Sequence, residues 1–310
     1  MRVLITGGSG LIGRSLAGDL AGAGHSVTVL TRSPGRLRGL PDFVQAVAWD
    51  GRTAAGWADQ AEGVDAIVNL AGESIAGENV AATFLGRWTA EKKRRIVQSR
   101  ANAGRAVADA VDAAASKPAV VIQMSGVGYY GAAAKGELDE GAPAGSDFLA
   151  HTCAAWEAAT DRVEQLGVRR VVLRTAVVLT RQGGVLPLML LPFRLFLGGP
   201  LGGGQQPFPW VHIDDVIGAI RFAIENRQVR GVANLVAPST PTNAEFSRLV
   251  GTVLHRPSWL PVPAFALRLL LGEKATIVLD GQRPVPKRLL SLGYRFRFHD
   301  PKTALEDLLR

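Results

Sequence analysis

The first thirty residues alternate between short apolar runs and one stretch with helical spacing. Residues 2–6 form an apolar run that ends in glycines, and residues 26–31 are rich in strand-forming side chains. Between them, residues 11–23 place four apolar side chains on one helical face, namely Leu11, Ile12, Leu16 and Leu20. This order predicts a strand, a helix and a second strand, which together form a βαβ unit.

Further apolar runs continue this alternation along most of the chain. They lie at residues 44–49, 66–70, 119–125, 170–174 and 232–236, and helix-length segments separate several of them. Parallel neighbours need crossover connections, so short buried strands that alternate with helices predict a parallel, doubly wound sheet. The expected fold class is therefore α/β with a Rossmann-type sheet.

The alternation breaks at about residue 179, where proline and glycine become frequent. It resumes with an amphipathic helix that Asp214 or Asp215 is expected to cap. After Pro238, helical segments with proline breaks continue to the end of the chain. We therefore expect two units, a dinucleotide-binding domain over residues 1–178 with 211–237 returning to it, and a smaller, mostly helical substrate domain over 179–210 and 238–310.

Composition supports a folded chain and narrows the class of partner. The 310 residues are 47% hydrophobic and 20% charged, which suits one or two compact domains. The net charge is +8, and the basic residues are scattered apart from the segments EKKRRIVQSR and GQRPVPKR. No helix or strand clusters basic with aromatic side chains, so nucleic-acid binding is not expected. The single cysteine, Cys153, excludes intrachain disulfides and favours a reducing compartment.

No segment is predicted to cross a membrane. The first strand is predicted to begin at residue 2, so no signal peptide is expected. The most apolar stretch, VLPLMLLPFRLFLGG, contains two prolines and an arginine and is shorter than the ~20 apolar residues that a span requires. We expect a cytoplasmic protein, with membrane docking by this stretch as the alternative. The five histidines form no H-x-x-x-H pair, and no metal site is expected.

Three glycines follow the first strand with the spacing of a dinucleotide-binding turn. Gly7, Gly10 and Gly13 lie between strand and helix, where a pyrophosphate must approach backbone N–H groups and a Cβ would obstruct it. Leu11 and Ile12, between the last two glycines, belong to the same expected site. The alternative is a glycine turn that binds no ligand.

The end of the second strand decides which dinucleotide is expected. An NAD site has a carboxylate there, about 20 residues after the glycines, for the ribose 2′-hydroxyl. This chain has Thr31 and Arg32 instead, with Arg36 nearby. A guanidinium matches a 2′-phosphate in charge and geometry, whereas a carboxylate would repel it, so the expected cofactor is NADP(H). The alternative is that Arg32 is a solvated loop charge.

Two later segments complete the expected cofactor site. Asp50 follows the third strand, where it either faces the adenine or caps a turn. The segment NLAGE follows the fourth strand at the cofactor edge of the sheet. Its small residues let the chain pass close to a ribose or nicotinamide, and the expected site comprises Leu70, Ala71, Gly72 and Glu73.

Long motifs along the whole chain resemble one protein family. They include GGSGLIG, VNLAGESI, SGVGYYG, FLAHTCAAWE, FPWVHIDDVIGAI, NLVAPSTPTNAEF and the C-terminal GQRPVPKRLLSLGYRF. The chain resembles the short-chain dehydrogenase/reductase superfamily in its extended, sugar-nucleotide epimerase-like branch. More narrowly, it resembles an atypical epimerase-family group, similar to NAD-dependent epimerases and dehydratases, which has a characteristic C-terminal domain and no assigned substrate.

This resemblance implies contacts that the residues alone do not indicate. It implies an NADP-type Rossmann domain in which Leu70 and Ala71 line the cofactor. It implies that Arg100 reaches a phosphate, with a surface helix charge as the alternative interpretation. It also implies that the backbone from Arg174 through Val178 passes near the nicotinamide.

The usual catalytic motif of the superfamily is missing. In its Tyr-x-x-x-Lys pair, the lysine one helical turn away lowers the tyrosine pKa, so that the phenol exchanges a proton with substrate. None of the three tyrosines here has a lysine four residues on. By resemblance, the two positions fall near Leu149 and Cys153, and neither side chain can do this work.

Substitute catalytic residues are expected in the segment SGVGYYG. The resemblance implies that Ser125, at the end of its strand, donates a hydrogen bond to a carbonyl of the substrate. Gly126 aligns equally well with the usual serine of the family. Tyr129 and Tyr130 are candidate proton donors, with ring packing under the loop as the alternative for each. Cys153 is expected to be inert packing.

Two further features have open interpretations. The segment GQRPVPKR is either a clamp for an anionic substrate or a solvated basic surface. His212 is expected to hydrogen-bond a loop rather than to move protons.

The leading functional hypothesis is an NADP(H)-dependent oxidoreductase that moves a hydride to or from a small-molecule carbonyl or alcohol. The alternatives are a sugar-nucleotide epimerase or dehydratase, which the missing Tyr/Lys pair weakens, and a catalytically silent NADP(H)-sensing protein. The sequence leaves the substrate, the direction of reaction and the oligomeric state open.

Overall fold

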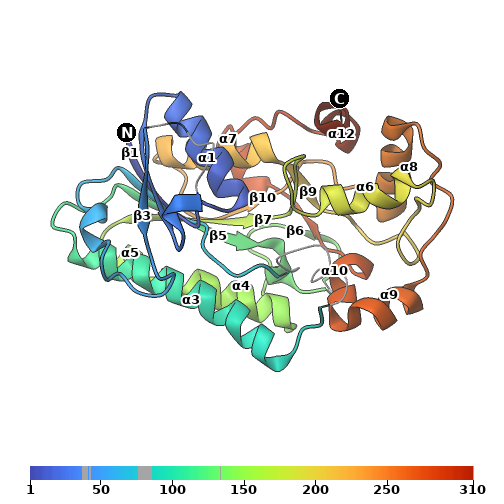
Figure 1. Ribbon diagram of the computed structural model, residues 1–310, viewed down its shortest axis with the longest axis horizontal. Coiled ribbons are helices and arrows are strands. Elements are labelled where there is room, and N and C mark those ends of the chain that lie inside the picture. Colours follow the sequence, from blue (N-terminus) through green and yellow to red (C-terminus); the bar gives the residue numbers. More distant parts are fainter. Residues whose placement is uncertain (37–40, 42, 76–85, 133, 310) are drawn as a thin grey trace.

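A parallel sheet forms the centre of the part of the chain that the computed structural model describes, residues 1–36, 41, 43–75, 86–132 and 134–309. In this part, seven strands lie side by side in the order β10-β7-β5-β4-β1-β2-β3, and each neighbouring pair is parallel (Figure 1). Their bounds are β1 (Arg2–Thr6), β2 (Ser26–Thr31), β3 (Val44–Ala48), β4 (Ala66–Asn69), β5 (Val120–Gly126), β7 (Arg169–Thr175) and β10 (Gly231–Leu235). The predicted doubly wound α/β fold is confirmed.

The strand order reverses at β1, and this reversal locates the binding edge. The chain runs outward from β1 to β2 and β3, then crosses back to β4 on the other side of β1. Open α/β sheets bind ligands at the carboxyl ends of their strands beside such a reversal. The carboxyl ends of β1, β2 and β4 are therefore the expected site.

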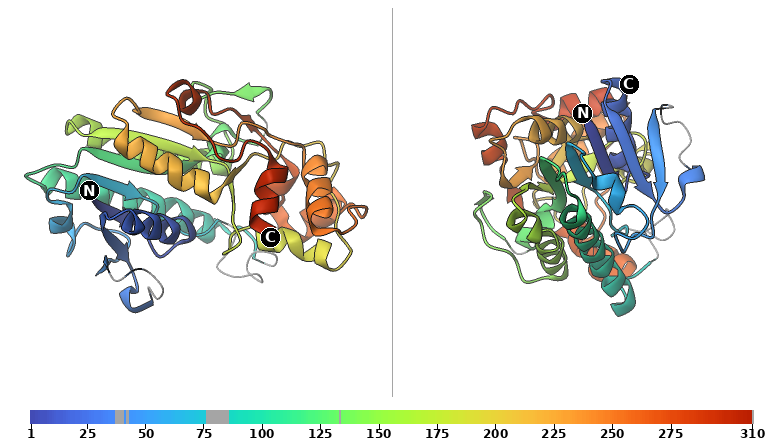
Figure 2. Two further views of the ribbon diagram at one scale, coloured as in Figure 1. Left: turned by 90° about the horizontal axis from the view of Figure 1, so that it is seen from above. Right: turned by 90° about the vertical axis from the view of Figure 1, so that its left-hand side faces the viewer.

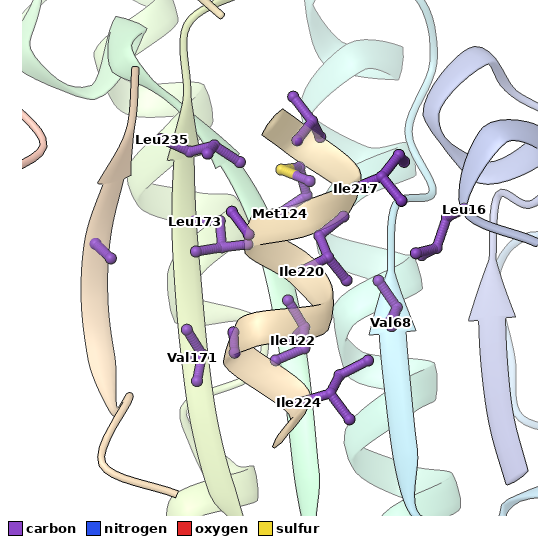
Figure 3. Packing of buried hydrophobic residues seen from close by; sticks show 14 of the residues in the cluster. Leu16, Val68, Ile122, Met124, Val171, Leu173, Ile217, Ile220, Ile224 and Leu235 are labelled. Atoms are coloured by element: carbon purple, nitrogen blue, oxygen red, sulfur yellow. The ribbon is translucent and has the colours of Figure 1, made fainter. Parts of the chain in front are cut away.

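Helices cover both faces of the sheet because its strands are apolar on both sides (Figure 1). On one face lie α1 (Leu11–Gly22) and α7 (Ile213–Glu225), and Figure 3 shows Ile217, Ile220 and Ile224 of α7 over the sheet. On the other face lies α3 (Ala90–Ala113), with α4 (Phe148–Ala158) and α5 (Arg162–Gln165) packed beside it. Both layers are held mainly by buried aliphatic side chains.

The cap of α7 differs from the predicted one. His212, the last residue of β9 (Trp210–His212), caps the helix, because its Nδ1 accepts a hydrogen bond from the N–H of Asp214 at 3.1 Å. The buried Asp215 instead accepts bonds from the N–H groups of Arg297 and Phe298. The prediction that Asp214 or Asp215 caps this helix is therefore wrong, since Asp215 anchors the C-terminal segment.

A further apolar cluster lies beyond the sheet, at the end of the molecule away from the N-terminus (Figure 2). It joins Trp210 of β9 to side chains of α6 (Leu186–Arg194), α8 (Asn243–Leu254) and α12 (Pro301–Leu309). The short strand β8 (Val177–Leu179) pairs with β9, and α9 (Ala264–Leu271) and α10 (Thr276–Leu279) form a smaller cluster of their own. This region is mostly helical.

Part of the C-terminal segment returns to the sheet. The strand β11 (Arg283–Pro284) pairs with β6 (Glu137–Leu138), and Leu289 of α11 (Lys287–Ser291) belongs to the cluster over the sheet. Tyr294 follows, and its hydroxyl donates to the Asp215 carbonyl at 2.9 Å. None of the helices in the described ranges is both long and apolar enough to span a bilayer.

Candidate functional site

The glycine turn between β1 and α1 has no room for a side chain at Gly7 or Gly13. Gly7 has φ of +67°, and an added Cβ there would lie 2.9 Å from the backbone of Leu70 and Ala71. An added Cβ at Gly13 would lie 2.5 Å from Gly8 Cα. The cap of α1 is Gly10, which offers no side-chain hydrogen bond to the first helical turn. The N–H groups of that turn, including those of the half-buried Leu11 and Ile12, therefore remain available to an anion.

The end of β2 presents an unpaired positive charge. Thr31 is buried, whereas Arg32 is exposed and, among the described residues, has no hydrogen bond or ion pair. Its side chain runs beside Gly51, where an added Cβ would lie 3.9 Å from Arg32 Cδ. A guanidinium in this position can meet an anion bound along the carboxyl edge of the sheet.

Asp50 holds the neighbouring turn. Its carboxylate accepts hydrogen bonds from the N–H groups of Thr53 at 2.9 Å and Arg52 at 2.7 Å, and from the Thr53 hydroxyl. The bond from the Thr53 backbone is the main reason that the pKa of Asp50 lies below its usual value. The structure thus shows the turn-capping role, and contact between Asp50 and an adenine stays a prediction.

Buried polar side chains hold the chain after β4 against the glycine turn. The Thr6 hydroxyl donates to Asn69 Oδ1 at 2.6 Å, and Asn69 Nδ2 donates to Gln123 Oε1 at 2.8 Å. The Ala71 N–H in turn donates to Thr6 Oγ1 at 3.3 Å. This network spans β1, β4 and β5, so it fixes Leu70 and Ala71 where Gly7 meets them.

Arg100 lies beneath the segment that contains Gly72 and Glu73. It is 6% exposed, so the interpretation of Arg100 as a surface charge is wrong. An added Cβ at Gly72 would lie 3.0 Å from Arg100 Cγ, and Arg100 Nη1 donates to the Glu73 carbonyl at 2.9 Å. Burial lowers the pKa of Arg100 to about 10, which leaves it charged at neutral pH. Its Nε has no partner within the described residues, and contact with a phosphate stays a prediction.

The carboxylate of Glu73 is directed toward α3. It forms ion pairs with Lys92 and Arg95 of that helix, and the Glu73 N–H donates to Ser99 Oγ at 3.0 Å. These contacts fix the end of the NLAGE segment on α3. A direct contact of Glu73 with the cofactor stays a prediction.

Leu149 and Cys153, which the resemblance aligns with the tyrosine and lysine of the usual motif, both lie on α4. Both face the turn after β5, because an added Cβ at Gly128 would lie 3.3 Å from Leu149 Cβ and 3.8 Å from Cys153 Sγ. Burial raises the pKa of the Cys153 thiol to about 11, so it stays protonated and is a poor nucleophile at neutral pH.

A buried ion pair occupies the interior beside this turn. Arg174 of β7 contacts Glu157 of α4 through two hydrogen bonds of 2.9 Å, and Arg174 is 3% exposed. Burial alone would lower the pKa of Arg174, but the Glu157 carboxylate raises it above its usual value. The Ser125 hydroxyl donates to the same carboxylate at 2.7 Å. Ser125 is thus hydrogen-bonded into the protein interior.

The two adjacent tyrosines differ in their surroundings. The Tyr130 hydroxyl is buried, donates to Asn234 Oδ1 at 2.7 Å and accepts from Arg174 at 3.2 Å. Burial raises the pKa of Tyr130. Tyr129 is only half-buried, and the centre of its ring lies 3.3 Å from Cζ of the Arg174 guanidinium. The structure therefore brings Ser125, Tyr129 and Tyr130 together around one arginine.

The loop after β8 lies beside the glycine turn. Val178 lies in β8, and the loop that follows contains Gly184, where an added Cβ would be 3.3 Å from Leu11 Cδ2.

In GQRPVPKR, Lys287 pairs with Asp139 at 3.0 Å and Arg283 approaches Glu137 at 3.9 Å. These two cations are balanced by acids of the neighbouring strand and loop. Within the described residues, no three potential metal ligands cluster.

Sequence reasoning missed Glu157 and the importance of Arg174. Glu157 lies one helical turn after Cys153 and two after Leu149, so it shares their face of α4. Arg174 is a charged residue within the apolar strand VVLRT. A charged side chain in a buried strand requires a partner of opposite charge, so Arg174 within this apolar run could have predicted a buried acid nearby.

Two family models match the chain. The model described as the NAD dependent epimerase/dehydratase family matches residues 3–235, and that of a domain of unknown function (DUF1731) matches residues 262–308. The epimerase family protein SDR39U1 of Mus musculus is 40% identical over 311 residues, covering 100% of both chains. The epimerase family protein YfhF of Bacillus subtilis is 36% identical, covering 100% of this chain and 98% of that protein.

Solved structures agree with these matches. The crystal structure of human epimerase family protein SDR39U1 (isoform2) with NADPH has a TM-score of 0.87 and 37% identity, and covers 99% of each chain. A UDP-glucuronic acid 4-epimerase from Bacillus cereus, in complex with NAD, has a TM-score of 0.77 at 15% identity, which shows a shared fold alone. The predicted resemblance to the epimerase family is confirmed.

Proposed function

Because the chain belongs to the NAD-dependent epimerase/dehydratase family, we propose that it binds NADP(H) at the carboxyl edge of its sheet and acts as an oxidoreductase. The observation that carries the cofactor choice is Arg32, an exposed guanidinium with no acidic partner in the described chain, at the end of β2. A 2′-phosphate supplies the missing negative charge. The NADPH bound by the human relative supports the same choice.

The glycine turn fits the pyrophosphate of such a cofactor. Its backbone approaches Leu70 and Ala71 so closely that a Cβ at Gly7 would collide with them. The uncapped first turn of α1 directs N–H groups and the positive end of the helix dipole at the same place. When bound, the nicotinamide supplies or accepts a hydride, and the protein must supply the proton.

Tyr129 is the proton donor that the geometry favours. Tyr130 already donates its hydroxyl proton to Asn234, and Ser125 donates its own to Glu157. Tyr129 is more accessible, and within the described residues its hydroxyl has no protein partner. The Arg174 guanidinium packs against the Tyr129 ring and thereby holds that ring in place from strand β7.

One observation favours a second function, an NADP(H)-binding protein without catalysis. Ser125 and Tyr130 are buried and hydrogen-bonded to protein groups, so neither is directed toward a substrate. In that case cofactor binding would act by changing the affinity for a partner. Turnover separates the two functions.

The test measures binding and turnover in one preparation. Titration of the purified protein with NADPH and with NADH should give tighter binding of NADPH. NADPH consumption is then followed with a panel of small aldehydes and ketones, and an active compound should lose its effect when Tyr129 is replaced by Phe. Tighter binding of NADH would contradict the cofactor assignment, and tight NADPH binding without turnover across the panel would favour the silent protein.

A further inference from the structure

A cavity of about 500 Å³ opens at the amino edge of the sheet, opposite the cofactor edge. Its lining includes Met1, Asp65, Arg169, Ile224, Arg227 and Arg230. Arg169 begins β7, and Figure 3 shows Ile224 at the lower end of α7, below Ile220 and Ile217. The seven residues of β7 separate this cavity from the carboxyl edge by about 20 Å. The cavity is therefore distinct from the proposed dinucleotide site.

Three arginines line this cavity, and within the described residues none of them has a carboxylate partner. Arg169 enters from β7, and Arg227 and Arg230 enter from the loop between α7 and β10. The two acids of the lining have other contacts, because Asp65 accepts the Arg2 N–H at 2.6 Å and Glu225 approaches Arg221 at 3.9 Å. The lining thus carries a local excess of positive charge.

Arg169 is held in place by the end of helix α7. Its Nη1 donates to the carbonyls of Ala223 at 2.7 Å and Val229 at 2.8 Å, and its Nη2 donates to Ile224 at 2.9 Å. The bonds to Ala223 and Ile224 use carbonyls of the last helical turn, the bond to Val229 uses the loop that follows, and together they fix the guanidinium plane. Within the described chain its Nε donor has no acceptor.

The charged form of Arg169 is disfavoured by its surroundings. Partial burial lowers the pKa of Arg169, and the positive charges of Arg230 and Arg227 lower it further. Arg227 and Arg230 are exposed, so their side chains are able to adjust around a ligand, whereas Arg169 is already oriented. An anion in the cavity would relieve this repulsion and accept forked hydrogen bonds from several arginines.

We propose that this cavity is a second anion site, which binds a diphosphate group between Arg169, Arg227 and Arg230. Diphosphate carries enough charge to bridge more than one guanidinium, and the volume admits a molecule larger than the diphosphate alone. The diphosphate could be free or form the tail of a nucleotide, because the same arginines recognise it in either case. The proposal is independent of the function of the opposite edge.

The test uses full-length protein saturated with NADPH, so that the glycine turn is already occupied. Inorganic pyrophosphate is titrated by calorimetry at low salt, and ADP is titrated separately. The variant is Arg227→Ala with Arg230→Ala. The control is Arg94→Ala with Arg248→Ala, which removes the same charge from exposed positions on α3 and α8 that do not line the cavity.

We expect one pyrophosphate per chain, with affinity lowered by about tenfold or more in the cavity variant and by less than about twofold in the control. Tighter binding of ADP would identify a nucleotide as the source of the diphosphate, and equal binding would indicate free diphosphate. Unchanged NADPH binding in the cavity variant would show that it is folded. No saturable binding to the wild type, or equal losses in both variants, would overturn the proposal.

Discussion

Replacing Glu157 by Gln tests the buried pair that organises the candidate catalytic turn. The substitution preserves the size of the side chain and one acceptor oxygen, so Ser125 and Arg174 Nε keep a hydrogen-bond partner. It replaces Glu157 Oε2, which accepts a hydrogen bond from Arg174 Nη2, by an amide NH2 group, which is itself a donor. Arg174, which is 3% exposed, is then left without a counter-charge.

The loss of unfolding free energy in Glu157→Gln follows from the burial of the remaining Arg174 charge. Breaking a buried ion pair by removing one partner costs about 3–5 kcal/mol, and the acceptor that Gln retains places this case near the lower end, at about 3 kcal/mol. Urea unfolding followed by circular dichroism measures this loss. A double variant, Glu157→Met with Arg174→Met, should recover part of it, because no buried charge is left unpaired.

The matched control is Glu137→Gln, which removes one carboxylate from the exposed contact with Arg283. Exposed ion pairs contribute little, so the unfolding free energy of this variant should equal that of the wild type. If Glu157→Gln were as stable as Glu137→Gln, Arg174 would not depend on Glu157, and the explanation of the catalytic turn would be refuted.

Three further predictions concern the glycine turn, the tyrosines and the cap of α7. Gly13→Ala should weaken NADPH binding and lower the free energy of unfolding, because the added Cβ meets backbone atoms. The added Cβ of Gly18→Ala, on the same helix, meets nothing within 4 Å, so this variant should raise the free energy of unfolding in urea by about 0.5–1 kcal/mol. Tyr129→Phe should abolish most turnover with little change in stability, and Tyr130→Phe should mainly destabilise, which kinetics and urea unfolding together distinguish. Burial lowers the pKa of His212 in the folded protein below its usual value of 6.5. As the pH falls from 7 to 5, the imidazole therefore binds a proton more readily in the unfolded chain than in the folded protein, and the free energy of unfolding should fall. His212→Asn, which keeps a capping oxygen, should flatten that dependence, and an unchanged slope would contradict the assignment.

The strands and the glycine turn could be predicted because local patterns determine them. Each strand of the sheet is a short apolar run, and the predicted bounds agree with the structure to within one or two residues. The glycines after β1 are required by a close backbone approach, which the sequence expresses directly.

The remaining features depend on contacts between distant segments. Glu157 and Arg174 lie on a helix and a strand, and their sequence positions do not show which side chain each will meet. The cap of α7 was mispredicted because acidic residues are common caps, whereas here the imidazole of His212 accepts the bond and Asp215 contacts residues more than eighty positions away. The arginine cavity likewise joins β7 to the loop before β10.

The cofactor preference of an Arg32→Ala variant shows whether the guanidinium at the end of β2 selects NADPH. Arg32 is exposed and unpaired among the described residues, so its removal should leave the fold intact. We expect the variant to lose about tenfold or more in affinity for NADPH while its affinity for NADH is unchanged, because only NADPH carries the phosphate that the guanidinium meets. Equal affinities for NADPH before and after the substitution, or equal losses for both cofactors, would contradict it.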